Sequence, residues 1–239
     1  MRIDVHFTPQ GLNPGDVSGR GVIVIDALRA TSTVVTALAN GAKAVIPAAT
    51  SDEAIRLASN LEKDGVLLAG ERRSFKIEGF DLGNSPREMT PEVVGGKTIV
   101  LATTNGTPAL VGAQGGEPVL VGAAVNFTAL TQRARGVLDE RGELAIICSG
   151  RERQFALEDA YTVGRITKAL KRRNRKIELN DAAVAALALV GAYEDWPEAF
   201  NDTAAARQLI EANLEEDVAF CAKPDQFGVV PQYAERRIT

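Results

Sequence analysis

The segment over residues 22–33, VIVIDALRATST, constrains the fold of this chain more than any other stretch. Its first four residues are all β-branched and apolar, which predicts a strand buried on both faces. Asp26 follows at the carboxyl end of that strand, and the apolar pattern of a helix begins after Thr33. A strand, a polar turn and a helix start form the first half of a βαβ unit. The segment therefore predicts an α/β protein whose ligand lies beyond the carboxyl end of this strand.

The turn after this strand has the chemistry of an anion site. Arg29 is followed by three hydroxyl residues, Thr31, Ser32 and Thr33, at the predicted start of the helix. Free backbone N–H groups and the positive end of the helix dipole favour an anion at such a position. The turn therefore predicts one wall of an active site for a phosphorylated, acidic substrate.

Composition excludes several classes of protein. The 239 residues suit one α/β domain over 1–239, and a net charge of −4 gives no support for a nucleic-acid or membrane surface. No apolar run reaches a membrane-spanning length and no signal peptide opens the chain, while Cys148 and Cys221 are too few for a disulfide framework. We therefore expect a cytoplasmic protein. The oligomeric state stays open, with a homo-oligomer as one alternative.

Other predicted strands also end in polar turns. The apolar runs 66–69, 98–102 and 143–148 are followed by GERR, TTNGTP and SGR. Because ligands bind outside the carboxyl ends of strands in an open α/β sheet, we expect these turns to meet at one edge. Carboxylate oxygens suit Mg²⁺, and arginine forks match phosphate and other oxyanions. Together the turns predict a magnesium-dependent phosphate site.

Asp159 gives an independent indication. On a helix predicted over about 155–172, it lies on the same face as the apolar residues Val163 and Ile166. A lone buried charge is costly and needs a partner, for which a metal ion or a catalytic role is favoured over a salt bridge to an arginine or the helix dipole. Glu158 points about 100° away, and from its position alone it is expected to be solvated.

Several enzyme signatures are missing. The sequence has no GxGxxG or GxxxxGK loop, Leu28 stands where an aspartyl-phosphate phosphatase needs an acid, and Gln154 stands where a cysteine phosphatase needs an arginine. His6 is the only histidine, and one histidine in a strand is typical of a structural residue. The class of hydrolase that remains uses magnesium-assisted attack by water.

The rest of the chain gives mainly structural indications. Ser85, Pro86 and Glu88 predict the capped start of a helix, which leaves Asn84 without a structural explanation. The last third is predicted to be helical over 181–193, 203–213 and 215–222, with a closing strand at 227–230.

Four segments carry a resemblance to a known family. In chain order, IDALRATST, GERRSFKIEGFDLGNSP, TTNGT and SGRERQFALEDAY resemble the 2-phosphosulfolactate phosphatase family, the ComB-like proteins. The resemblance implies a three-layer α/β/α sandwich with a mostly parallel or mixed central sheet. It also implies magnesium-dependent hydrolysis of (R)-2-phospho-3-sulfolactate to 3-sulfolactate and phosphate, a step of coenzyme M biosynthesis in organisms that make it. From about Arg173 onwards no motif matches.

The resemblance places the family's motif acids on Asp26, Glu71, Glu158 and Asp159, which we predict to hold Mg²⁺ directly or through water. The predicted catalytic residues are Asp26, Arg29, Glu71 and Asp159. The predicted contacts to a small anionic phosphoester are Thr31, Ser32, Thr33, Arg72, Asn84, Thr104, Asn105, Gly106, Thr107 and Arg151.

Two other functions stay open. A non-catalytic binding protein for small phosphorylated or sulfonated acids would use the same anion-binding loops and would need no metal. A phosphotransferase would need an acceptor pocket, which the sequence does not show.

Overall fold

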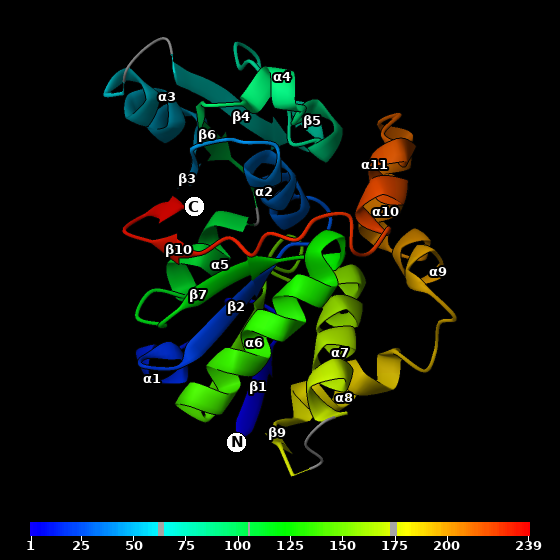
Figure 1. Ribbon diagram of the computed structural model, residues 1–239. Coiled ribbons are helices and arrows are strands. Elements are labelled where there is room, and N and C mark those ends of the chain that lie inside the picture. Colours follow the sequence, from blue (N-terminus) through cyan, green and yellow to red (C-terminus); the bar gives the residue numbers. More distant parts are fainter. Residues whose placement is uncertain (62–64, 105, 173–175) are drawn as a thin grey trace.

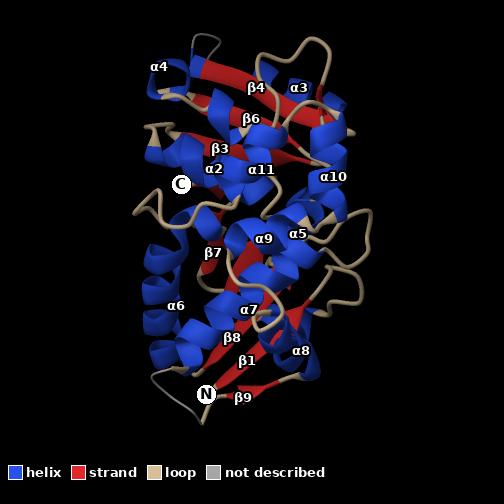
Figure 2. Cartoon of the chain, turned by 90° about the vertical axis from the view of Figure 1, so that its right-hand side faces the viewer, coloured by secondary structure: helices blue, strands red, loops and turns tan. Residues whose placement is uncertain are grey.

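The computed structural model describes residues 1–61, 65–104, 106–172 and 176–239, and its strands form two sheets (Figures 1 and 2). The first sheet has the order β7-β2-β8-β1-β9, and all of its strand pairs are parallel. Its strands are β1 (Arg2–His6), β2 (Gly21–Ile25), β7 (Val119–Gly122), β8 (Glu143–Cys148) and β9 (Glu178–Leu179).

The second sheet has the order β10-β11-β3-β6-β4-β5. Its three central strands, β3, β6 and β4, are parallel, and antiparallel strands flank them on both sides. Its strands are β3 (Ala44–Ala48), β4 (Val66–Arg72), β5 (Phe75–Lys76), β6 (Thr98–Ala102), β10 (Tyr233–Ala234) and β11 (Arg237–Ile238).

Helices surround both sheets, and the predicted α/β class is confirmed. They are α1 (Pro14–Val17), α2 (Ala30–Ala39), α3 (Ser51–Ser59), α4 (Pro91–Val94), α5 (Gly106–Gly112), α6 (Phe127–Arg141), α7 (Leu157–Lys171), α8 (Asp181–Leu189), α9 (Trp196–Asn201), α10 (Ala204–Glu211) and α11 (Glu215–Cys221), with the 3₁₀ turns η2 (Pro86–Glu88) and η3 (Ala124–Asn126). Within the described residues, none of these helices has the length and apolar character needed to cross a bilayer.

Strand β2 is buried on both faces, as its sequence predicts. Ile23 and Ile25 belong to the core that the first sheet forms with α6 and α7. Val22 and Val24 face the opposite way, into a core that also contains Val45 of the second sheet. This second core joins the two sheets, so the central strand contributes to both halves of the molecule.

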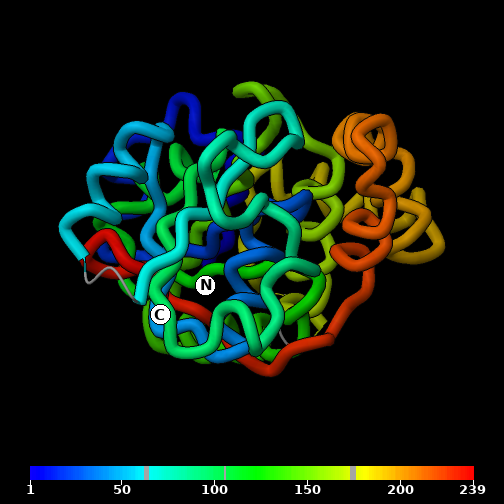
Figure 3. Tube along the Cα trace, turned by 90° about the horizontal axis from the view of Figure 1, so that it is seen from above, coloured from blue at the N-terminus to red at the C-terminus, as the bar shows by residue number. Residues whose placement is uncertain are grey.

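The end of the chain differs from its prediction. The expected strand at 227–230 is wrong, because these residues form a loop and the chain closes with the β10–β11 hairpin instead. Phe227 packs against the small core of Val35, Ala123 and Val125, so its apolar side chain serves packing rather than a strand pairing. The C-terminal helices α9, α10 and α11 lie together at one side of the molecule (Figure 3, orange).

Candidate active site

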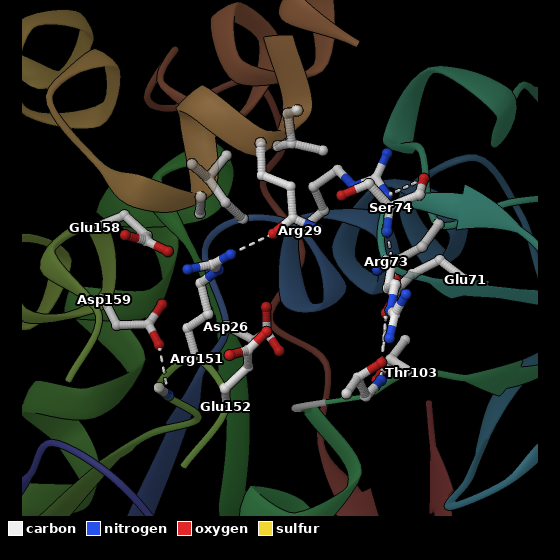
Figure 4. Close-up of a pocket in the computed structure, with 17 residues that line it drawn as sticks. Asp26, Arg29, Glu71, Arg73, Ser74, Thr103, Arg151, Glu152, Glu158 and Asp159 are labelled. Atoms are coloured by element: carbon white, nitrogen blue, oxygen red, sulfur yellow. Dashed lines mark hydrogen bonds between the residues drawn. The ribbon is translucent and has the colours of Figure 1, made fainter. Parts of the chain in front are cut away.

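A pocket of about 110 Å³ lies where strands of both sheets end, and its residues come from segments far apart in the sequence (Figure 4). Strand β2 contributes Asp26 directly after its last residue, and β8 leads to Arg151. Strand β4 contributes Glu71, and β6 leads to Thr103. The structure thus brings the four predicted strand ends together at one site.

Three buried carboxylates form one wall, which we call the acidic wall: Asp26, Glu158 and Asp159. They are only 7%, 4% and 2% exposed. The two oxygens of Asp159 accept hydrogen bonds from the backbone N–H groups of Ala27, at 2.8 Å, and Gly150, at 3.1 Å. In the described part of the chain none of the three carboxylates forms a salt bridge. The partners of Asp159 are therefore backbone N–H groups and not the arginine that was considered as the alternative to a metal ion.

Burial makes the acidic wall hard to ionise. It raises the pKa of Asp26 to about 6, with a further rise from the charge of Glu71, and raises the pKa of Glu158 to about 7. The pKa of Asp159 also lies well above its usual value, because of burial first and then the charges of Asp26 and Glu158. A bound cation would relieve this shared cost.

The opposite wall, which we call the donor wall, consists of Glu71, Arg73, Ser74, Thr103 and Thr104. One oxygen of Glu71 accepts from the Thr104 backbone N–H, at 3.3 Å, and from the Thr104 hydroxyl, at 3.1 Å. The other accepts from the Ser74 backbone N–H at 2.9 Å. The Glu71 side chain is thus fixed by the loops after β6 and β4.

Two tight turns border the pocket and use residues that rarely adopt their conformation. Arg73 and Ser74 connect β4 to β5 with φ of 51° and 73°, and Glu152 and Arg153 form a similar turn with φ of 51° and 65°. Both residues of each turn lie in the left-handed region, where Asn and Gly are usual in a two-residue hairpin. Such strain occurs at functional sites, and Arg73, Ser74 and Glu152 line the pocket.

Two arginines approach the pocket, and both are held by the C-terminal helices. Arg29 is 4% exposed and donates through Nη1 to Oδ2 of Asp217 on α11, at 2.7 Å. Arg151 donates to the side-chain oxygen of Gln208 on α10. The last third of the chain therefore completes a site whose recognisable motifs all precede it.

The donors present fit Mg²⁺ in their chemistry. The acidic wall supplies hard carboxylate oxygens, and Oδ1 of Asn84, a pocket residue that is 5% exposed, has no hydrogen-bond partner among the described residues. No three His, Cys, Asp or Glu side chains in the described ranges surround one point closely enough to hold a metal. Mg²⁺ commonly binds through one or two carboxylates, a phosphate and several waters, so these residues suit the ion without forming a closed shell.

Of the predicted site residues, eight line the pocket: Asp26, Arg29, Glu71, Asn84, Thr104, Arg151, Glu158 and Asp159. Arg72 lines a neighbouring pocket that shares Glu71, Arg73, Thr103 and Thr104 with the site pocket. There its Nη2 donates to the Ser51 hydroxyl at 3.3 Å. Gly106 is buried at the start of α5 without lining the pocket, and Asn105 lies outside the described residues.

Four predicted hydroxyl contacts stand behind the pocket wall. The hydroxyls of Thr31, Ser32, Thr33 and Thr107 donate to the backbone carbonyls of Asp26, Ala27, Asn84 and Ala48, at 2.8, 2.8, 3.1 and 2.9 Å. Short hydroxyl side chains commonly bond to nearby backbone, and here that leaves them away from the ligand space. None of these four residues lines the pocket, and their contact with the substrate stays a prediction.

Glu158 requires a correction. Its helix position alone predicts a solvated acid, but it is 4% exposed and lines the pocket together with Ala205 and Leu209 of α10. The resemblance to the family had already placed it among the site acids.

Two residues near the site were missed from sequence. Asp217 precedes Val218 and stands four residues before Cys221, both of which are buried, so it is a carboxylate in an apolar stripe like Asp159. The same argument could have found it. Gln208 carries no such signal, because a glutamine on a partly exposed helix is ordinary.

Comparison with known proteins gives one consistent result. The family model described as 2-phosphosulpholactate phosphatase matches residues 6–236. A protein of Caldanaerobacter subterraneus subsp. tengcongensis is 41% identical over 233 residues, which cover 97% of this chain and 95% of that protein. Relatives from Clostridium acetobutylicum (35% identical, all of both chains) and Thermotoga maritima (40% identical, 90% of this chain and 89% of the relative) carry the same name, "Probable 2-phosphosulfolactate phosphatase".

Proposed function

This chain belongs to the 2-phosphosulfolactate phosphatase family, and we propose that it hydrolyses (R)-2-phospho-3-sulfolactate to 3-sulfolactate and phosphate with a bound Mg²⁺ ion. One observation carries the catalytic part of the proposal: three buried carboxylates share a pocket with two arginines that approach from other segments. In an organism that makes coenzyme M, the reaction would serve its synthesis, and we expect it to take place in the cytoplasm.

The acidic wall favours an enzyme over a binding protein. A protein that only binds a phosphorylated or sulfonated acid gains nothing from Asp26, Glu158 and Asp159, because their charges would repel the ligand. With a cation between them and the substrate, the same carboxylates become an advantage. The pocket therefore suits metal-assisted phosphoryl transfer to water better than anion storage.

We assign the roles by position. Asp26, Glu158 and Asp159 would hold Mg²⁺, directly or through water. When bound, the ion would polarise a phosphoryl oxygen and offset the charge that develops on the phosphoryl group. Arg29 and Arg151 would donate to substrate oxygens, and Asn84 would accept a hydrogen bond from a water in the pocket.

The reaction then balances as a hydrolysis. Water attacks phosphorus, and a pocket carboxylate accepts the proton that this water loses. The bond between phosphorus and the ester oxygen breaks, and that oxygen takes up the proton from the pocket carboxylate and leaves as the hydroxyl of 3-sulfolactate. Glu71, fixed by three donors, faces this space from the opposite wall and is a second acceptor for the water proton.

The direct test is phosphate release by the purified full chain from 2-phospho-3-sulfolactate, with Mg²⁺ and with EDTA. A parallel assay with 2-phosphoglycerate, which lacks the sulfonate, measures substrate choice. We expect release that requires Mg²⁺ and favours the sulfonated ester. Calorimetric binding of the ester without phosphate release under any metal condition would instead identify a binding protein. Formation of 3-sulfolactate together with a phosphorylated alcohol, and without free phosphate, when an alcohol acceptor is present would identify a phosphotransferase.

A further inference from the structure

We infer that Asp217, on α11, is a positioning residue for this reaction and acts by fixing the guanidinium of Arg29 at the pocket. The inference rests on the proposed function, because the proposed function is what assigns Arg29 a contact with the substrate. Asp217 lies outside the segments that resemble the family motifs, and it does not line the pocket itself.

Asp217 is fully buried and both of its oxygens are used. Oδ2 accepts from Nη1 of Arg29 at 2.7 Å, and Oδ1 accepts from the hydroxyl of Ser85 at 2.6 Å. The Arg29 side chain is 4% exposed, so this ion pair lies almost entirely out of water. A charged hydrogen bond of this length in a buried setting fixes the direction of the guanidinium plane.

The pair connects the two walls of the pocket. Nη2 of Arg29 donates to the backbone carbonyl of Ser74, at 3.2 Å, on the donor wall. Arg29 itself directly precedes α2 as its N-cap residue, three residues after Asp26 of the acidic wall. Figure 4 shows Arg29 between Ser74 and the acidic side chains. Helix α11 therefore holds Arg29 in place, and Arg29 in turn connects the acidic wall to the donor wall.

Asp217 also holds a second pocket segment. Ser85, which donates to it, is the cap of η2 and directly follows Asn84. Asn84 lines the pocket and carries the unpartnered Oδ1. A single carboxylate therefore bonds both to Arg29 and to Ser85, the residue next to Asn84.

The competing charges nearby explain why Arg29 needs such a partner. Burial raises the pKa of Asp26, and the nearby charge of Arg29 offsets only a small part of that rise. Without Asp217, the freed guanidinium would turn toward the carboxylates of the acidic wall, where a metal ion is expected. A buried ion pair adds little net stability compared with apolar packing, so its value here is the orientation that it imposes.

The test compares Asp217→Asn with Glu216→Gln, the matched change one residue away. Glu216 also links α11 to η2, through an ion pair with Arg87, but both partners are exposed, at 66% and 47%. We expect D217N to lower kcat/KM about 100-fold, the size expected for misplacing a catalytic group by about 1 Å, and E216Q to change it less than about 2-fold. Equal, small effects of both variants would overturn the inference.

A double-mutant cycle separates positioning from general loss of structure. If Asp217 acts through Arg29, D217N lowers kcat/KM no further in an Arg29→Gln background, and D217N and R29Q divide their losses between kcat and KM in the same way. Independent, multiplying losses would overturn the inference. The inference would also be overturned if D217N lowered only kcat, and by no more than the fraction of the protein that circular dichroism shows to be unfolded.

Two controls keep the outcomes distinct. If D217N does not fold, the R29Q/D217N chain decides, since it leaves no unpaired buried charge: activity equal to R29Q supports the inference, and lower activity contradicts it. A wild-type chain that releases no phosphate from any ester contradicts the proposed function instead. An active wild type with an active D217N contradicts only the role of Asp217.

Discussion

The two walls of the pocket contain carboxylates in opposite physical states. On the acidic wall, Asp26, Glu158 and Asp159 are buried, and the pKa of each lies above its usual value. On the donor wall, Glu71 is partly exposed and accepts three hydrogen bonds. Ionised carboxylates are therefore unfavourable on the acidic wall, whereas the carboxylate on the donor wall is stabilised by hydrogen bonds.

This difference predicts different roles for the two walls. Crowded, buried carboxylates release free energy when a cation arrives, so the acidic wall is the side on which a metal ion is favoured. A carboxylate that already accepts three hydrogen bonds gains less free energy from binding a metal ion, and we expect it to keep its hydrogen bonds instead. The contrast can be tested, because equivalent substitutions on the two walls should have effects of opposite sign.

Asp26→Asn should give the largest effect. We expect it to lower kcat/KM at least about 10³-fold, because it removes a group assigned to the metal and the attacking water. The same change should raise the unfolding free energy of the metal-free chain at pH 8 by about 2 kcal/mol, since a buried charge is replaced by a neutral amide. Steady-state kinetics and urea unfolding measure the two quantities.

Glu71→Gln is the matched change on the donor wall. It should lower the unfolding free energy by about 1 kcal/mol, because an amide cannot accept at both ends and one backbone or hydroxyl donor is left unpaired. If D26N destabilised the metal-free chain as E71Q does, the proposed difference between the walls would be wrong.

The acidic wall should also give the metal-free chain an unusual pH dependence. The pKa of Asp26 rises from 3.8 to about 6 on folding and that of Glu158 from 4.5 to about 7, so the folded chain binds more protons than the unfolded chain. The stabilisation is then complete below about pH 4 and is lost as the pH rises through about 6 to 7, at a cost of about 3 kcal/mol from Asp26 alone.

Urea unfolding in EDTA between pH 5 and pH 8 measures this loss. D26N should flatten the curve, and added Mg²⁺ should restore stability at pH 8 in the wild type but less in D26N. A stability that stays constant or increases over this range in EDTA would contradict the buried, uncompensated state of the acidic wall.

Two neighbouring arginines should differ on the donor wall. Both arginines line the neighbouring pocket, but only Arg73 also lines the site pocket, and Arg72 bonds to Ser51. We expect Arg73→Gln to raise KM about tenfold with little change in kcat, since it removes a cation that attracts the substrate in the ground state. Arg72→Gln should raise KM less than about twofold. A larger effect at Arg72 would place the substrate in the neighbouring pocket.

The sequence predicts the acidic wall better than the rest of the site. Asp26 follows a run of four β-branched apolar residues, which predicts a strand buried on both faces. Asp159 interrupts an apolar helix face. Both acids can therefore be identified from local sequence patterns. Asp217 obeys the same pattern as Asp159, but its partner Arg29 is 188 residues away, and nothing local indicates the pairing. The division of the strands into two sheets is hidden for the same reason, because pairings between distant strands leave no local pattern.

Turn geometry limits the prediction of the donor wall. Arg72 and Arg73 are adjacent and chemically identical, and only the left-handed turn at Arg73 and Ser74 decides which of them reaches the pocket. Hydroxyls at helix starts are equally ambiguous, because a ligand and a backbone carbonyl satisfy them equally well.

Thr104 and Thr107 allow the smallest and most specific test of this ambiguity. Thr107→Val removes a hydroxyl that donates to the Ala48 carbonyl at 2.9 Å behind the pocket, so we expect a loss of about 1 kcal/mol in unfolding free energy and unchanged kcat and KM. Thr104→Val removes a donor to Glu71 on an exposed residue, so stability should stay nearly constant while kcat/KM falls about threefold. Urea unfolding and initial rates on both variants separate the two roles. If T107V instead raised KM without loss of stability, the hydroxyl would contact the substrate as its place in the sequence suggests, and the donor wall would extend to the start of α5.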